Sequence, residues 1–125
     1  MRAARYGRAR VFFFDEQAYL EPTGFWTRAG GAATVVVDVD GSARAEGMQL
    51  FLRAGAVATS LEASAGAWTR TWNLQAGQEA VVTLPPVDNT SSLALTLRSG
   101  AGFRPFAVDR ASDDVRHLAV WVEIR

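Results

Sequence analysis

With 125 residues and a mass of 13.5 kDa, the chain is long enough for one domain that buries its own core. Hydrophobic residues make up 49% of it and charged residues 21%, as in an ordinary globular protein, so wholesale disorder is excluded. The 13 basic and 13 acidic side chains give a formal net charge of +0. No long-range field attracts nucleic acid, and we expect no nucleic-acid partner.

Side chains that commonly bind metals or act as nucleophiles are scarce. The chain has no cysteine, which excludes disulfides and thiolate sites, and His117 is its single histidine. No apolar run approaches the roughly 20 residues that cross a bilayer, so we expect no direct insertion into a membrane. We therefore predict no bound metal and no other cofactor.

The pattern of short apolar segments is typical of an all-β protein. Residues 1–8 (MRAARYGR) are rich in arginine and are expected to form a flexible N-terminal stub or linker, followed by a single domain over residues 9–125. Apolar or alternating runs then recur about every ten residues between Gly, Pro, Asp and Asn clusters, with no sustained helical spacing. We predict strands over residues 9–15, 24–28, 33–39, 48–53, 59–64, 68–74, 79–84, 92–98 and 117–124.

Eight or nine short antiparallel strands without a covering helix indicate a two-layer β-sandwich of jelly-roll or immunoglobulin-like kind. Alternation also predicts which side chains face the core, because successive residues of a strand point to opposite sides. Trp121 is expected on the outer side of the last strand, either half exposed or covered by a loop. The predicted core residues of the last two strands are Leu93, Leu95, Leu97, Leu118, Val120, Val122 and Ile124.

The segment AWTRTWNL, residues 67–74, provides the first candidate binding surface. Trp68, Arg70 and Trp72 point to one side of a strand, and the threonines between them point to the other. If the tryptophan side faces solvent, two indoles about 13 Å apart with an arginine between them form a platform for sugar rings. In the alternative, both indoles cap the core or lie under a loop, and the threonine side is wet.

A second candidate surface surrounds the turn EPTG at residues 21–24. Tyr19 and Trp26 flank this turn, and Arg28 either anchors a sugar or anionic ligand or is a solvated charge at a strand end. Three acidic residues nearby either accept hydrogen bonds from a ligand, bind calcium, or are solvated turn residues. These are Asp15, Glu16 and Glu21.

The sequence does not favour an enzyme. A serine triad needs a histidine base, and His117 lies at a strand entrance in a chain that lacks a GxSxG turn. No pair of carboxylates stands out for glycoside hydrolysis, and no glycine-rich phosphate loop is present. We therefore predict a protein without catalytic activity.

The segment GFRPFAVDRASDDVRH, residues 102–117, is expected to close the fold. Phe103 and Pro105 hold the chain extended as it leaves the leucine strand. Asp114 and Arg116 are two residues apart, so in an extended chain they point to the same side and can bind each other or a backbone group. These four residues are interpreted as a structural clasp.

Three stretches, VFFFDEQAYLEPTGFWTRAG, GFRPFAVD and SDDVRHLAVWVE, together resemble the C-terminal β-sandwich accessory domain of large bacterial membrane proteins of glycosyltransferase type. That family ends with Phe-x-Pro, a gap, and then Asp-x-Arg-x-Leu-Gly before a final strand. The matching positions here are Phe103, Pro105, Asp114, Arg116, Leu118 and Ala119, with alanine in place of glycine. The resemblance implies an extracytoplasmic accessory domain, periplasmic or at the cell surface, with a jelly-roll-like sandwich that contacts glycan. It transfers no catalytic residue.

Two functions remain open. The first is a carbohydrate-binding accessory module that contacts bacterial glycan or polysaccharide through Trp68, Trp72, Trp26 and Tyr19, with Arg28 or Arg70 as polar partners. The second is a structural or protein-interaction domain that docks on a membrane-embedded parent chain and has no ligand of its own. The degree of exposure of the tryptophans distinguishes the two.

Overall fold

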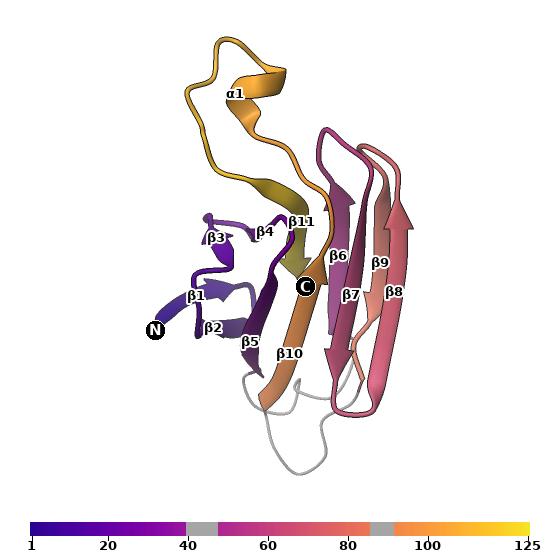
Figure 1. Cartoon of the computed structure of the whole chain (residues 1–125). Coiled ribbons are helices and arrows are strands. Elements are labelled where there is room, and N and C mark those ends of the chain that lie inside the picture. The colour runs from indigo at the N-terminus through magenta and orange to yellow at the C-terminus, as the bar shows by residue number, and fades with distance from the viewer. Residues whose placement is uncertain (40–47, 86–91) are drawn as a thin grey trace.

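The structure, a computed structural model, describes residues 1–39, 48–85 and 92–125. It is an all-β sandwich of two antiparallel sheets, which confirms the fold class predicted from the sequence (Figure 1). Sheet A consists, in spatial order, of β1 (Arg2–Tyr6), β2 (Ala9–Phe13), β5 (Ala32–Val39), β10 (Ser92–Ser99), β7 (Thr59–Ala65) and β8 (Trp68–Leu74). Sheet B consists of β3 (Ala18–Leu20), β4 (Phe25–Arg28), β11 (Leu118–Ile124), β6 (Gln49–Ala54) and β9 (Glu79–Thr83).

The core lies between the two sheets. Sheet A contributes Leu95 and Leu97, which are completely buried as the alternation of the leucine strand predicts. Sheet B contributes Val120 and Val122, which are also completely buried. Burying each of these side chains stabilises the fold by roughly 1.5–3 kcal/mol. The inner faces of the strands therefore supply most of the driving force for bringing the sheets together.

The N-terminal residues differ from the prediction, because the segment assigned to a flexible stub contains strand β1. It pairs antiparallel with β2 along its whole length, and Gly7 makes the connecting turn at a φ of +62°. The ring of Tyr6 is only 4% exposed and contacts the ring of Phe25 at a centroid distance of 6.3 Å. Strand β1 carries two arginines, Arg2 and Arg5, and is only partly buried, so its composition resembles that of a solvated tail, which explains why the strand was missed.

Two other short elements were not predicted: strand β3 and the helix α1 (Pro105–Val108). Helix α1 belongs to the segment that links β10 to β11, residues 100–117, which we call the crossover. Figure 1 shows that α1 lies beyond the ends of the strands, at one end of the sandwich. Pro105 occupies the first turn of this helix, where its missing N–H costs nothing.

Strand β11 departs from regular alternation near its start. The pairing of β11 with β4 is irregular between Leu118 and Trp121, so Ala119 faces the core while Leu118 is buried outside it. Leu118 is therefore buried, but not on the core side of the strand where it was predicted to lie, and Ala119 lies there instead. The cause is one residue of irregular pairing, which changes the side of every residue before it.

At the irregular pairing, a side chain supplies a hydrogen bond that the backbone of the partner strand does not make. Oγ1 of Thr27 accepts a hydrogen bond of 3.1 Å from the backbone N–H of Val120, and Thr27 is only 1% exposed. This threonine thus satisfies a buried donor that regular strand pairing would otherwise satisfy.

Candidate functional site

The two tryptophans of β8 do not form a platform on the outer side of sheet A. Trp68 and Trp72 are half-buried and pack against the core, whereas Thr69 and Thr71 are exposed. Arg70 is directly opposite Ala63, a core residue, so it shares the inner side with the indoles. Its side chain is nevertheless exposed, because β8 is the edge strand of sheet A. The indoles therefore cap the core and the threonine side is wet, as in the second of the two alternatives.

A different set of aromatic residues lies on the outer side of sheet B. Tyr19 on β3 is paired with Trp26 on β4, and Trp26 is paired with Trp121 on β11. These three residues form the aromatic row. The row crosses three neighbouring strands at right angles, and Arg53 on β6 continues it next to Trp121. The order β3-β4-β11 creates the row, because it places the last strand beside the β3–β4 hairpin.

The aromatic row has a buried end and an accessible end. Trp121 is 6% exposed, its ring lies 5.5 Å from that of Trp26, and its Nε1–H donates a 2.7 Å hydrogen bond to Glu123. A side chain at Gly24 would approach the Trp121 ring to 2.8 Å, so glycine is what lets the indole lie across this turn. Tyr19 and Trp26 are only half-buried. Trp121 is thus the buried end of the aromatic row, and Tyr19 and Trp26 form its solvent-accessible surface.

Phe103 fixes the crossover onto this face. Its backbone N–H and C=O each make a 2.8 Å hydrogen bond with Leu118, and its ring meets Trp26 edge-on at 5.9 Å. The ring also occupies the space where Gly55 would carry a Cβ. Pro105 then starts α1, so the first half of the crossover is held by backbone pairing and aromatic packing.

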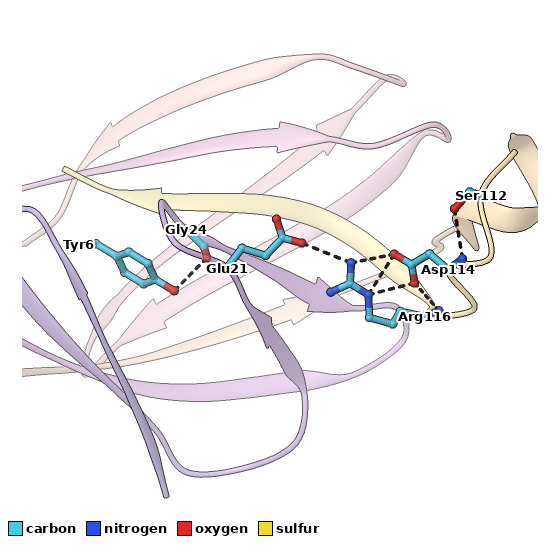
Figure 2. A network of polar contacts seen from close by, with 6 residues as sticks. All are labelled: Tyr6, Glu21, Gly24, Ser112, Asp114 and Arg116. Atoms are coloured by element: carbon cyan, nitrogen blue, oxygen red, sulfur yellow. Dashed lines mark hydrogen bonds and ion pairs between the residues drawn. The ribbon is translucent and has the colours of Figure 1, made fainter.

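Arg116 connects the second half of the crossover to the β3–β4 hairpin (Figure 2). Its Nε and Nη2 donate to both carboxylate oxygens of Asp114, at 2.7–3.1 Å, and Nη2 also donates to Glu21 at 3.3 Å. The guanidinium lies over the ring of Tyr19, with Cζ 5.4 Å from the ring centroid. Hence Arg116 belongs both to the clasp and to the edge of the aromatic surface.

Figure 2 also shows that Tyr6, on strand β1, contacts the turn between β3 and β4. The hydroxyl of Tyr6 donates a 2.8 Å hydrogen bond to the backbone oxygen of Gly24, and the N–H of Glu21 donates to that same oxygen at 2.8 Å. At the other end of the network, Oγ of Ser112 accepts from the N–H of Asp114. Strand β1, the β3–β4 turn and the crossover are thus connected through Tyr6, Glu21 and Arg116.

The ion pairs shift the pKa values of their members. Hydrogen bonds from Arg116 hold the pKa of Asp114 below its ordinary value of 3.8, and the bond to Asp114 raises the pKa of Arg116. Partial burial alone raises the pKa of Glu123, but hydrogen bonds from Trp121 and Arg125 outweigh it and leave the pKa lowered. Burial of the Tyr6 phenol raises its pKa to about 12. Asp114 and Glu123 are therefore carboxylates committed to ion pairs at neutral pH.

The acidic residues near the turn do not gather into a metal site. Asp15 accepts hydrogen bonds from the backbone N–H groups of Gln17 and Thr34, both at 3.0 Å, and Glu21 binds Arg116. Within residues 1–39, 48–85 and 92–125, no three His, Asp or Glu side chains lie close enough to hold a metal ion. Calcium at Asp15, Glu16 and Glu21 gains no support from this arrangement.

Arg28 extends the polar rim of the aromatic surface. It lies two residues after Trp26 on the same side of β4 and is exposed. Sequence reasoning singled out Tyr19, Trp26 and Arg28 for this surface and Phe103 for the clasp, but not Arg53, whose position depends on strand order. For Trp121, the third member of the aromatic row, the sequence does hold a local signal, because alternation places it on the side of the last strand opposite the core residues Val120 and Val122.

The crossover exposes apolar side chains of its own. Phe106, Val108 and Val115 are 44%, 56% and 62% exposed, and none of the four residues of α1 is buried.

In the described parts of the chain, no helix has the length and apolar character needed to cross a membrane. Comparisons with models of known protein families, with curated protein sequences and with solved structures found no match to this chain.

Proposed function

We propose that this domain is a non-catalytic saccharide-binding module whose binding surface is the accessible end of the aromatic row. The observation that supports it most directly is the pairing of two half-buried aromatic residues, Tyr19 and Trp26, on adjacent strands of a rigid sheet. Aromatic faces with nearby polar groups are suited to sugar rings, because the rings bind the apolar side of the sugar and the polar groups bind its hydroxyls.

Polar groups are available where hydroxyls would lie. Arg116 and Glu21 border Tyr19, and Arg28 follows Trp26 on the same side of the strand. Arg116 is held by Asp114, so its orientation does not have to be fixed when a ligand arrives. The resemblance of the closing motif to the accessory domain of bacterial glycosyltransferase-type membrane proteins supports an extracytoplasmic role on bacterial glycan.

The test is a titration of the domain with neutral and acidic oligosaccharides, followed by NMR through the indole N–H signals of its tryptophans. The signal of Trp26 should shift at roughly millimolar ligand, and Tyr19→Ala should weaken binding about tenfold, as the loss of roughly 1.4 kcal/mol requires. Thr71→Ala, on the outer side of sheet A, is the matched control and should bind like the wild type. If no oligosaccharide shifts any tryptophan signal, saccharide binding is wrong.

A second function, docking on a larger parent protein, is favoured by the crossover. Three exposed apolar side chains, Phe106, Val108 and Val115, lie on a segment whose backbone makes several hydrogen bonds of its own. A photo-crosslinker placed at Phe106 in cells should give one defined adduct if this segment docks, and a crosslinker at Thr71 should not. Equal labelling from both positions would contradict docking.

A further inference from the structure

The charged side chains around the aromatic row differ in whether they already have a partner. Three carboxylates on this side are engaged: Asp114 and Glu21 bind Arg116, and Glu123 binds Trp121 and Arg125. The guanidinium groups of Arg116 and Arg125 offset two of these three negative charges, which reduces the repulsion that an incoming anion would meet on this face.

The arginines are not all engaged. In the part of the chain that the structure describes, neither Arg28 nor Arg53 has a carboxylate within ion-pair distance. Arg28 is about 7 Å along β4 from Trp26, on the same side, whereas Arg53 is beside Trp121. Arg53 is also opposite Glu79 in the register with β9, so its charge is partly offset. Arg28 is therefore the cation best placed to meet a ligand on the aromatic row.

We propose that the saccharide bound at this surface is acidic, with a uronate carboxylate that binds Arg28 while a neighbouring ring stacks on Trp26. This inference rests on the proposed function, because it specifies the ligand of the same site. The planar guanidinium matches a carboxylate in two parallel hydrogen bonds, and such a charged pair discriminates against an uncharged group at the same position. Arg53 adds a second, weaker attraction toward the other end of the row.

The experiment uses the intact domain and two acidic oligosaccharides, oligogalacturonate and oligomannuronate, each as the free acid and as the methyl ester. The methyl ester removes the negative charge and adds only one methyl group, so the ratio of the two affinities mainly reports the contribution of the arginines, and the arginine variants separate that contribution from the effect of the methyl group. An exposed ion pair contributes roughly 0.2–1 kcal/mol, so Arg28→Gln should weaken binding of the acid by a factor of about 1.4 to 5 and leave the ester unchanged. Arg53→Gln should have a smaller effect, and added salt should weaken only the acid.

Arg98→Gln is the control, because Arg98 is exposed on the outer side of sheet A. If acid and ester bind equally, or if neutral oligosaccharides bind and the acids do not, the acidic ligand is wrong while the saccharide-binding function stands. If Arg28→Gln changes the binding of acid and ester by the same factor, Arg28 does not contact the carboxylate and the inference fails. If no saccharide binds at all, the inference and the proposed function fail together.

Discussion

Arg116 and Asp114, two residues apart in the crossover, form a bidentate ion pair whose shortest hydrogen bond is 2.7 Å. The ion pair itself is local, and it is joined to a distant segment because Arg116 also binds Glu21, 95 residues away, and lies over the ring of Tyr19. About a third of the Arg116 side chain remains exposed. The ion pair is therefore screened by water and holds a geometry rather than supplying much of the folding free energy.

Replacing Arg116 with alanine should lower the free energy of unfolding by about 1 kcal/mol, because the variant loses a partly exposed charged hydrogen-bond network. Arg116→Lys keeps the positive charge but cannot make the two parallel hydrogen bonds of the guanidinium, so its loss of unfolding free energy should be smaller than that of Arg116→Ala. Urea denaturation measures both changes. Arg110→Ala, in the same crossover but exposed, should leave the free energy of unfolding unchanged. An Arg116→Ala variant as stable as the wild type would show that the clasp is not structural.

Acid should remove the contribution of Asp114. A carboxyl group whose pKa is lowered on folding stabilises the fold above its unfolded value, and this contribution is lost as the pH falls through the folded pKa. The difference in stability between wild type and Asp114→Asn should thus be constant near neutral pH. It should shrink below the ordinary value of 3.8 and vanish once Asp114 is protonated in both states. Urea denaturation at a series of pH values measures it, and a difference that grows as the pH falls would contradict the ion pair.

Thr27→Val should destabilise the domain by about 1–3 kcal/mol, although valine has nearly the shape of threonine. The substitution leaves the buried N–H of Val120 without its side-chain acceptor. Thr27→Ser keeps the hydroxyl and loses one methyl group, which costs about 0.8 kcal/mol. Thermal or urea unfolding should therefore rank the serine variant above the valine variant. The opposite order would mean that packing, not the hydroxyl, decides stability at this position.

The phenol of Tyr6 should ionise at about pH 12 in the folded protein, because its burial disfavours the charged form. A raised pKa means that the stabilisation is complete below the unfolded value of 10.0 and is lost as the pH rises toward 12. The chain has 2 tyrosines, so Tyr19→Phe leaves Tyr6 as the only chromophore for a tyrosinate absorbance titration. Ionisation near pH 10 while the far-UV spectrum stays native would contradict the buried hydrogen bond to Gly24.

How far the sequence predicts this molecule depends on how local each feature is. The alternation of Leu95 and Leu97 was sufficient to place β10, because one side of that strand is apolar and the other polar. The same rule failed at Leu118, because the irregular pairing depends on the partner strand β4. In β8 both sides carry side chains that tolerate either environment, so alternation gave the two sides correctly but not which of them faces the core.

The candidate site shows the same limit. The contact of Asp114 with Arg116 follows from a spacing of two residues, but the contact with Glu21 needs the crossover to return to the turn between β3 and β4. Tyr19 and Trp26 could be selected because they flank one turn, whereas Arg53 joins them only through the order of strands in sheet B. Strand order is determined by the packing of the whole domain, and a single sequence does not encode it in any short pattern.

Arg70 has a consequence for the behaviour of the protein at high concentration. Strand β8 is seven residues long and pairs only with β7 along the described chain, so its outer edge offers free backbone groups to a strand of another molecule. An added strand would extend the inner face of sheet A and would cover the guanidinium, which would lose water without gaining a partner. A single charge on the inner side of an edge strand thus protects the domain against fibre-like aggregation.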